Sequence, residues 1–296
     1  MPLVGVGYRH EAGALIQRSV PPIEAVEITV DHCIKGTRAQ REALEALPDL
    51  CPVFLHGVGL SLGTAVEPDR EYLDQVRDHA RRLRVPWYSE HLAFTKVPGL
   101  DLAQLLPLPR TREVLEIVCE HVEVVQERVG LPLLLENISY YFEFPDHQLD
   151  EAEFLVEACR RTGAGILLDV ENLRINSINF GFDPLAFIAR LPPRSVRALH
   201  LAGGCRDGEL AIDTHDHPVP PATLRLLEAA LAAHQPDVLI VERDQGFSTF
   251  EETLTDVEAI KQIRDRSGEG AAAGAPARAA RAPGGSRGVR AQRASR

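Results

Sequence analysis

Eight short apolar segments recur along the chain, and most of them have a polar residue at or next to their last position. Each segment is rich in Val, Leu or Ile and is apolar on both faces, which is typical of buried parallel strands. The predicted strands are Leu3–Gly7, Ala25–Ile28, Val53–His56, Trp87–His91, Leu133–Asn137, Gly165–Asp169, Val196–Leu201 and Val238–Glu242. Strands of this kind need helices on their faces to keep them from water.

Helical patterns lie between most of these strands. The predicted helices are Arg38–Leu47, Asp69–Leu83, Thr111–Val129, Glu151–Thr162, Pro184–Ala189, Pro221–Ala233 and Phe250–Arg264. Alternation of strands and helices indicates an α/β protein with a parallel sheet. An open doubly wound sheet is one solution, but polar residues after nearly every strand favour a TIM-like (β/α)8 barrel, in which all eight strand ends face one cavity.

The length of the chain is compatible with one barrel domain and a tail. We expect residues 1–266 to form the barrel, since such barrels occupy roughly 250 residues. Residues 267–296 are rich in Ala, Gly and Arg and have almost no large apolar side chain, so we expect a disordered tail and assign it no function. This tail has six arginines and one glutamate, a charge of +5, which leaves −16 for the body of a chain with a net charge of −11. An acidic body argues against nucleic acid and anionic membranes as partners.

Cysteine usage indicates a reducing compartment. The five cysteines are odd in number and form no C-x-x-C pair, so neither a disulfide framework nor a zinc ribbon is indicated. The first residues lack the basic and apolar regions of a signal peptide, and no segment approaches the ~20 apolar residues of a membrane span. We therefore expect a cytoplasmic protein.

Six of the predicted strands carry a typical metal ligand as their last or next-to-last residue. These residues are His56, His91, Glu136, Asp169, His200 and Glu242. Taken singly, each histidine is more often a hydrogen-bonded core or turn residue, and each carboxylate is more often a partner of an arginine or a helix cap. Buried carboxylates at strand ends are costly unless they are paired or bound to metal, and so many at one end of a barrel favour a joint metal site. The loop 212–217 adds further imidazole and carboxylate candidates.

The ligand types limit the metal. Imidazoles and carboxylates without a thiolate fit iron, manganese or zinc, and they do not fit an iron–sulfur centre. The candidates exceed the needs of one ion, so two or three ions bridged by carboxylates such as Glu136 are indicated.

Several motifs resemble those of the multinuclear non-heme iron-dependent oxidases, the family of enzymes that act on precursor peptides in methanobactin and 3-thiaglutamate biosynthesis. The resemblance runs from about Leu3 to Asp244, and the motifs are specific together rather than singly. They are Gly5-Val6-Gly7-Tyr8-Arg9, His56-Gly57-Val58-Gly59-Leu60-Ser61-Leu62-Gly63, Leu105-Leu106-Pro107-Leu108-Pro109, Glu136-Asn137-Ile138-Ser139, Leu167-Leu168-Asp169-Val170, His200-Leu201-Ala202-Gly203 and Ile212-Asp213-Thr214-His215-Asp216.

The resemblance implies a site, cofactors and partners. It implies two or three irons as cofactor and dioxygen as co-substrate. The substrate that it implies is a precursor peptide, in which cysteine is the residue commonly oxidised. It also implies a small partner protein that binds the leader segment of the peptide. The iron ligands that it implies are His56, His91, Glu136, Asp169, His200, Asp213, His215 and Glu242, with Asn137 as a further candidate.

The chain also departs from the usual family pattern near the predicted barrel mouth. Glu90 stands where Asp is usual, Val170-Glu171-Asn172 replaces Val-Asn-Asn, and Gly204 occupies a position where histidine is common. We expect Glu90, Asn172 and Asp216 to lie around the ligands and to tune them.

Two other classes of function stay open at this point. One is a divalent-metal sugar isomerase of the same barrel type, which would work without oxygen; a related endonuclease is opposed by the acidic body. The other is a metal-binding scaffold that recruits a peptide without changing it.

Overall fold

A closed barrel of eight parallel strands forms the centre of the protein, which confirms the predicted fold. The computed structural model describes residues 1–20, 22–244 and 250–273. Around the barrel the strands follow the order β1-β12-β9-β8-β7-β4-β3-β2, and each neighbouring pair is parallel. The barrel strands are β1 Leu3–Gly7, β2 Ala25–Thr29, β3 Val53–Gly57, β4 Tyr88–His91, β7 Leu133–Glu136, β8 Gly165–Asp169, β9 Val196–Leu201 and β12 Val238–Val241.

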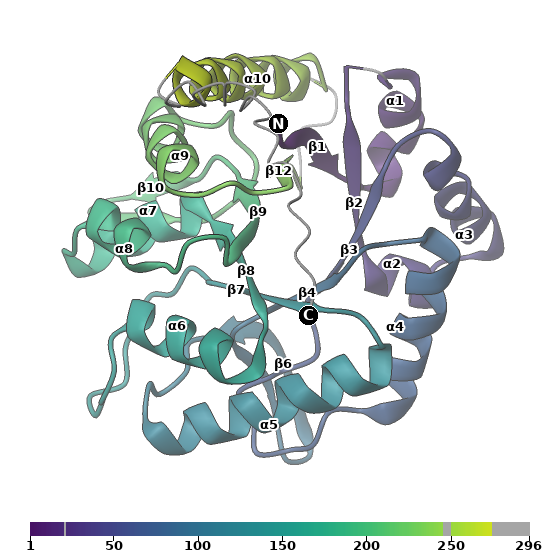
Figure 1. Ribbon diagram of the computed structural model, residues 1–296. Coiled ribbons are helices and arrows are strands. Elements are labelled where there is room, and N and C mark those ends of the chain that lie inside the picture. Colours follow the sequence, from purple (N-terminus) through teal and green to yellow (C-terminus); the bar gives the residue numbers. More distant parts are fainter. Residues whose placement is uncertain (21, 245–249, 274–296) are drawn as a thin grey trace, which may run out of the picture.

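Helices surround this barrel as an outer ring (Figure 1). Their bounds are α1 Gly13–Arg18, α2 Val30–Lys35, α3 Arg38–Glu45, α4 Arg70–Leu83, α5 Arg112–Val129, α6 Glu151–Thr162, α7 Val170–Phe180, α8 Pro184–Arg190, α9 Pro221–Ala233 and α10 Phe250–Ala273, with short 3-10 turns at His10–Ala12 and Leu47–Asp49. Local signals set several of these ends. Asp150 caps α6 in a capping box, and Gly163 ends the same helix at a φ of +72°, a conformation that glycine adopts without strain. Among the described residues, no helix is both long and apolar enough to cross a bilayer.

The strand period explains why the candidate ligands share the interior of the barrel. Side chains two residues apart lie on the same face of a strand. An apolar cluster fills the interior, with Phe54 stacked on Trp87 at 4.7 Å between ring centroids. His56 lies two residues after Phe54, and Glu136, Asp169 and His200 each lie two residues after another member of that cluster. The apolar cluster therefore forms a floor, and the polar side chains form the layer above it at the carboxyl ends of the strands.

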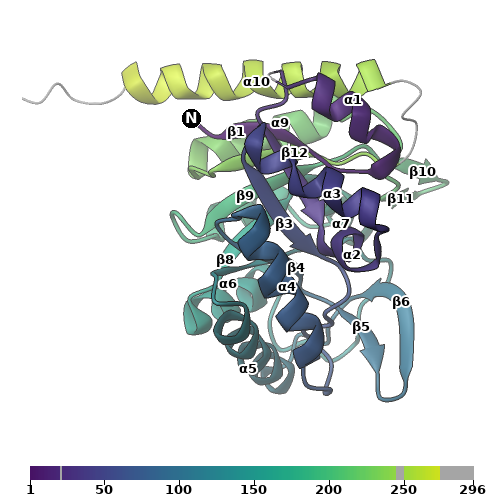
Figure 2. The same cartoon turned by 90° about the vertical axis from the view of Figure 1, so that its right-hand side faces the viewer.

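Two hairpins, which the sequence did not predict, stand at the same side of the molecule. They are β5 (Phe94–Val97) with β6 (Leu100–Leu106), and β10 (Cys205–Asp207) with β11 (Leu210–Ile212). Figure 2 shows both projecting from the side of the barrel that faces away from the N-terminus. They extend the wall around the carboxyl ends of the strands.

The last helix extends further than the sequence predicted. Helix α10 continues to Ala273, beyond the expected start of the tail at residue 267. The remainder of the predicted tail, residues 274–296, lies outside the described residues. The division of the chain into a barrel domain and a disordered tail therefore stays a prediction.

Candidate metal centre

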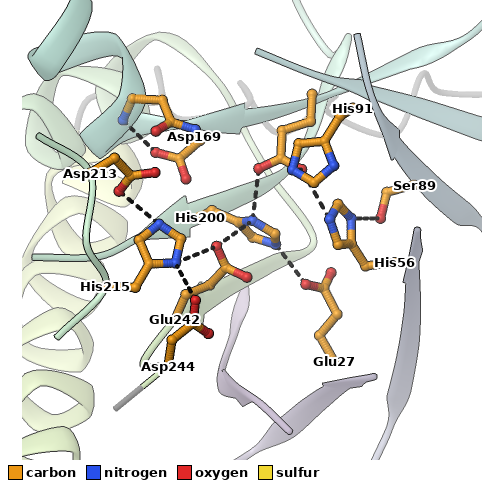
Figure 3. Close-up of polar contacts among 12 residues, drawn as sticks. Glu27, His56, Ser89, His91, Asp169, His200, Asp213, His215, Glu242 and Asp244 are labelled. Carbon is orange, nitrogen blue, oxygen red and sulfur yellow. Dashed lines mark hydrogen bonds and ion pairs between the residues drawn. The ribbon is translucent and has the colours of Figure 1, made fainter. Parts of the chain in front are cut away.

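Three side chains from neighbouring strands form a first group of candidate ligands. Nε2 of His56 and Nε2 of His91 each lie 3.4 Å from Oε2 of Glu136. The imidazole rings meet edge to face, 4.7 Å apart. Two ligands that each lie about 2.1 Å from one ion are separated by roughly 3.0–3.5 Å, so this spacing fits a shared cation. Figure 3 shows both rings beside one carboxylate.

Hydrogen bonds on the far side of each ring orient these imidazoles. Nδ1 of His91 lies 3.1 Å from the carbonyl oxygen of Gly57, which can only accept, so Nδ1 carries the proton. Nδ1 of His56 lies 3.0 Å from Oγ of Ser89, whose hydroxyl donates to the carbonyl of Leu55. In the neutral rings both Nε2 atoms are thereby left as acceptors that face Glu136, the arrangement that metal-binding histidines need.

A second group shares Glu136 with the first. It consists of Glu136, Asp169, His200 and Glu242, which are all buried. Nδ1 of His200 lies 3.0 Å from Oε1 of Glu136 and 3.2 Å from Oε2 of Glu242. Three carboxylates beside one imidazole in the interior of a protein require a compensating positive charge. Glu136 therefore presents one oxygen to each group, as a bridging carboxylate would.

The pKa directions in this layer show how strongly the carboxylates interact. Burial raises the pKa of Asp169, and the charges of Asp213 and Glu136 raise it further. Burial acts the same way on Glu136, but the three neighbouring imidazoles outweigh it and lower the pKa of that carboxyl. Burial lowers the pKa of His56. The layer thus contains more negative charge than its imidazoles neutralise.

A pair from the loop after β11 lies against the second group. Nε2 of His215 is 2.8 Å from Oδ1 of Asp213, and Nδ1 of His215 is 3.7 Å from Oε2 of Glu242. Despite the short distance, neither Oδ1 of Asp213 nor Nε2 of His215 has a hydrogen-bond partner. The two atoms form a close ion pair that lacks hydrogen-bond geometry, and such a pair of donor atoms could hold one ion between them.

Unpartnered buried atoms test whether the donor set fits metal ions. Buried polar atoms are nearly always paired, so a cluster of exceptions needs a cause. Here the buried atoms without a hydrogen-bond partner include Oε2 of Glu136, Oδ2 of Asp169, Oδ1 of Asp213, Nε2 of His200, Nε2 of His215 and Oε2 of Glu27. They are nitrogen and carboxylate donors without a thiolate, which fits two or more ions of the iron, manganese or zinc type.

The sequence matches the model of a known protein family. Residues 3–265 match the model of the RiPP precursor modification enzymes MbnB/TglH/ChrH. The chain belongs to this family. The match covers the whole barrel, including every residue of the two ligand groups.

Relatives in the MbnB/TglH/ChrH family are similar along most of their length. A UPF0276 protein of Caulobacter vibrioides is 35% identical over 248 residues, which are 84% of this chain and 89% of that protein. A UPF0276 protein of Rhizorhabdus wittichii is 36% identical over 263 residues, 88% of this chain and 94% of that protein. A UPF0276 protein of Chromobacterium violaceum is 38% identical over 242 residues, 81% of this chain and 87% of that protein.

Solved structures show the fold of this family member to be a common one. An L-ribulose 3-epimerase superposes with a TM-score of 0.60 at 16% identity, covering 96% of this chain and all of that one (100%). A xylose isomerase domain protein from Planctomyces limnophilus superposes with a TM-score of 0.57 at 15% identity, covering 90% of this chain and 99% of the other. At these identities the likeness establishes the barrel and nothing about the reaction.

The structure gives one predicted ligand a different environment. The side-chain amide of Asn137 donates to the carbonyl of Asp169 and accepts from its backbone N–H, both at 2.9 Å. Both polar atoms of Asn137 thus join the ends of β7 and β8. This geometry supports Asn137 as a residue that positions Asp169, and it does not support Asn137 as a ligand.

Two of the three residues expected around the ligands do contact them. Glu90 is fully buried, accepts from the Tyr88 hydroxyl at 2.8 Å and accepts from the His91 backbone at 3.2 Å. The Asn172 backbone donates to Oδ1 of Asp169 at 2.7 Å. Asp216 instead accepts hydrogen bonds from Thr214 and His217 within its own loop.

The two remaining departures from the usual family pattern are neighbours in space. A Cβ at Gly204 would lie 3.3 Å from Oε1 of Glu171. Glu171 is fully buried and is held by Arg174 and by the Thr223 hydroxyl. The same Cβ would lie 2.3 Å from the carbonyl oxygen of Ile212, so a larger residue at position 204 would require the backbone to shift and would also crowd this buried carboxylate.

Two acidic residues at the site were not singled out from the sequence. Oε1 of Glu27, from the inner face of β2, lies 2.7 Å from Nε2 of His200. Asp244 follows Glu242 and lies beside His215. A carboxylate inside the otherwise apolar segment Ala25–Ile28 was the available signal for Glu27, because a buried strand rarely contains an unpaired charge.

A cavity of about 660 Å³ opens at the barrel mouth above these residues. It reaches His91 and Asp213, and the β5–β6 hairpin lines it through Asp101, Gln104 and Leu105. His91 and Asp213 keep 12% and 15% of their side chains exposed, whereas His56, Glu136 and His200 are buried. The candidate metal centre therefore opens to solvent through the mouth, past His91 and Asp213.

Proposed function

We propose that this chain is an iron- and oxygen-dependent oxidase that modifies a residue, cysteine in our proposal, of a ribosomally made precursor peptide. The sharing of Glu136 between two groups of ligands carries this proposal, since it supports a centre with two or three irons rather than one. The description of the family, precursor modification enzymes, supports the class of substrate.

Bound iron would supply the redox equivalents and Lewis acidity that dioxygen chemistry requires. The residues of the chain provide the framework for that chemistry. Ser89 and the Gly57 carbonyl fix the rings of His56 and His91, while Asn137 and Asn172 fix Asp169. The apolar floor with Phe54 and Trp87 excludes water from the base of the site.

The peptide would enter through the mouth cavity, which is large enough for a short segment. We propose that a small partner protein holds the leader of the peptide beside this mouth, and that both work in the cytoplasm. All five cysteines of the chain are unpaired, and none belongs to a ligand group, so the oxidised thiol would be that of the substrate.

A divalent-metal isomerase is the second candidate. The group Glu136, Asp169, His200 and Glu242 would be sufficient for one divalent ion, and similar solved structures include proteins described as sugar epimerases. Such an enzyme would need one Mn²⁺ or Mg²⁺ and no oxygen.

Metal analysis with Mössbauer spectroscopy on protein purified without oxygen tests the proposal first. Two or three coupled irons per chain are expected. Co-expression with a Cys-bearing precursor peptide and its leader-binding partner should then change the mass of the peptide only in the presence of O₂. H215A and E242A should abolish that change while the fold is retained. Full turnover in both variants, or a single Mn²⁺ and an unchanged peptide, would overturn the assignment.

A further inference from the structure

One carboxylate of the barrel interior belongs to neither of the two ligand groups. Glu27 lies in the middle of β2 and is buried. Its Oε1 is 2.7 Å from Nε2 of His200, and among the described residues no other ion pair reaches this carboxylate. A buried carboxylate with a single partner is costly, so the contact with His200 needs an explanation.

The strand period places Glu27 in the same layer as the candidate ligands. Ala25, two residues before Glu27, belongs to the apolar floor, so both side chains lie on the inner face of β2. Of all the side chains in this layer, only Glu27 and Ser89 are not candidate ligands. The other members, each two residues after a floor residue, are His56, Glu136, Asp169, His200 and Glu242.

Ser89 shows what a residue of this layer does when it is not a ligand. Its Oγ lies 3.0 Å from Nδ1 of His56, while the opposite ring nitrogen, Nε2, faces Glu136 at 3.4 Å. Ser89 therefore supports the imidazole on the side that faces away from the ligand group.

Glu27 stands in the same relation to His200. It lies at Nε2, whereas Nδ1 is 3.0 Å from Oε1 of Glu136 and 3.2 Å from Oε2 of Glu242. Figure 3 shows these contacts at opposite nitrogens of the ring, with Glu27 on one side and the ligand group on the other. The imidazole of His200 thus lies between the second ligand group and one supporting carboxylate.

The two nitrogens of a neutral imidazole share one proton. Glu136 and Glu242 attract this proton to Nδ1, which would block the atom that faces the ligand group. Glu27 attracts it to Nε2 and leaves Nδ1 as an acceptor. The angle at Nε2 lies outside hydrogen-bond geometry, but the last torsion of a glutamate side chain is soft, so the carboxylate can align with an N–H without a backbone shift.

We propose that Glu27 is a positioning residue of the metal centre, which holds His200 so that Nδ1 is the nitrogen that binds the ion of the second ligand group. The carboxylate of Glu27 does not itself bind an ion. Metal-binding histidines commonly donate their other N–H to a carboxylate, which fixes the ring and makes it a stronger ligand. The proposal needs a metal centre, but it depends neither on the identity of the metal nor on the oxidase reaction.

Zinc titrated into the metal-free whole protein tests this role without any turnover. E27M removes the carboxylate at a similar side-chain length, whereas E27Q keeps an acceptor oxygen. Each is combined with H56Q, which disrupts only the first ligand group, and with D169N, which disrupts only the second. Beside H56Q, E27M should weaken zinc binding by about 10- to 100-fold, and E27Q by less. Beside D169N, neither should change it.

S89A is the matched control, because it removes the corresponding support of His56. It should weaken zinc binding beside D169N and have no effect beside H56Q, which lacks that imidazole. The melting temperature of the metal-free protein gives a second readout. Replacement of a buried charge by an apolar side chain is often neutral or stabilising, so E27M alone should melt no lower than the wild type.

A crystal structure of the zinc-loaded wild type should show zinc on Nδ1 of His200 and Glu27 against Nε2. A Glu27 oxygen bound to zinc, or zinc bound through Nε2, overturns the positioning role. An equal loss of affinity beside H56Q and beside D169N also overturns it, since Glu27 would then support the fold in general. Should E27M not fold, E27Q carries the same comparison, and its loss of affinity should be confined to the H56Q background. Protein that consumes no O₂ with a Cys-bearing peptide would overturn the oxidase and leave these zinc results standing.

Discussion

Asp244 holds His215 at two points. The backbone N–H of Asp244 donates to the carbonyl of His215 at 2.8 Å, and its Oδ2 lies 3.5 Å from Nδ1 of the same residue. His215 has a φ of +51°, in the left-handed region that residues other than glycine rarely adopt. Arg9, from the end of β1, in turn donates to Oδ1 of Asp244 at 2.8 Å. The unusual conformation of His215 is thus maintained by Asp244, which is itself held by Arg9 from the end of β1, the strand that pairs with β12.

The first prediction concerns this support. D244A should weaken binding of the ion nearest His215 by about 10- to 100-fold, the usual effect of removing a residue that orients a ligand. Titration of iron into the metal-free protein measures the effect. D216A is the matched control, since Asp216 lies in the same loop and contacts only Thr214 and His217. Equal iron affinity in D244A and D216A would contradict this role.

The second prediction concerns the sharing of Glu136. E136Q should reduce the number of bound ions by more than H56Q does, because Glu136 belongs to both ligand groups and His56 to one. Elemental analysis of both variants gives the numbers. H121Q serves as a control, because His121 is also buried but bonds only to the carbonyl of Leu62, at 2.9 Å. Loss of the same single ion from E136Q and H56Q would show that the two groups are independent.

The barrel and most of its candidate ligands could be predicted, because the period of two along a strand and the position of a residue at a strand end both follow from the sequence. His56, Glu136, Asp169 and His200 end apolar segments, and the parity of each strand directs them inward above the apolar floor. This prediction of the ligand layer does not require knowing which residues that are remote in sequence are neighbours in the structure. It explains why the same residues come together in the structure.

The sequence pattern did not predict helix α7, and the reason is physical. Its buried side chains include Glu171, Asn172 and Asn176, so it lacks the apolar repeat that marks an amphipathic helix. Asn176 instead accepts from the backbone of Tyr140 at 3.1 Å and donates to the carbonyl of Ile138 at 2.8 Å. Such polar packing depends on the loop that follows β7, which is remote in sequence.

The environments of Asn137 and Glu27 likewise depend on partners across the barrel. Asn137 stands at a strand end like the ligands, and only the backbone of Asp169 reveals that its amide is already engaged. Glu27 lies within a strand rather than at its end, and its contact with His200 spans the barrel interior. The position of a residue at a strand end therefore does not show whether its side chain is already engaged, as that of Asn137 is, and it overlooks Glu27.

The third prediction is a pH dependence of stability that originates at Glu151. Burial raises the pKa of this carboxyl to about 7, against the opposing effects of Arg110 and the Tyr140 hydroxyl. Because the folded state holds the proton more tightly than the unfolded state, the stabilisation is complete below the ordinary pKa of glutamate and is lost as pH rises through 7. The side chain is not wholly enclosed, so we expect a loss of about 1–3 kcal/mol.

Urea unfolding of the wild type and E151Q between pH 4.5 and 8 measures this effect. E151Q should decline less steeply than the wild type, since the amide keeps a partner for Tyr140 and has no proton to lose. E153Q, in the same helix, is the control: Glu153 is exposed, and the slope of this variant should match that of the wild type. Parallel slopes for the wild type and E151Q would refute the assignment.

The last prediction compares two glycines of the loop that begins at His56. A Cβ at Gly57 would collide with the Tyr88 hydroxyl and with Oε2 of Glu90, whereas a Cβ at Gly59 would meet nothing within 4 Å. G57A should therefore break the Tyr88–Glu90 hydrogen bond and displace the Gly57 carbonyl that orients His91. We expect G57A to lower the stability by about 1–3 kcal/mol, as overpacking of a buried site does, and to lose iron from the His56–His91–Glu136 group. G59A should retain both its melting temperature and its iron. The two substitutions are chemically identical and lie two residues apart. Loss of iron in both variants would mean that the loop needs glycine for backbone freedom. Retention of iron in both would mean that Tyr88 and Glu90 do not hold His91 in place.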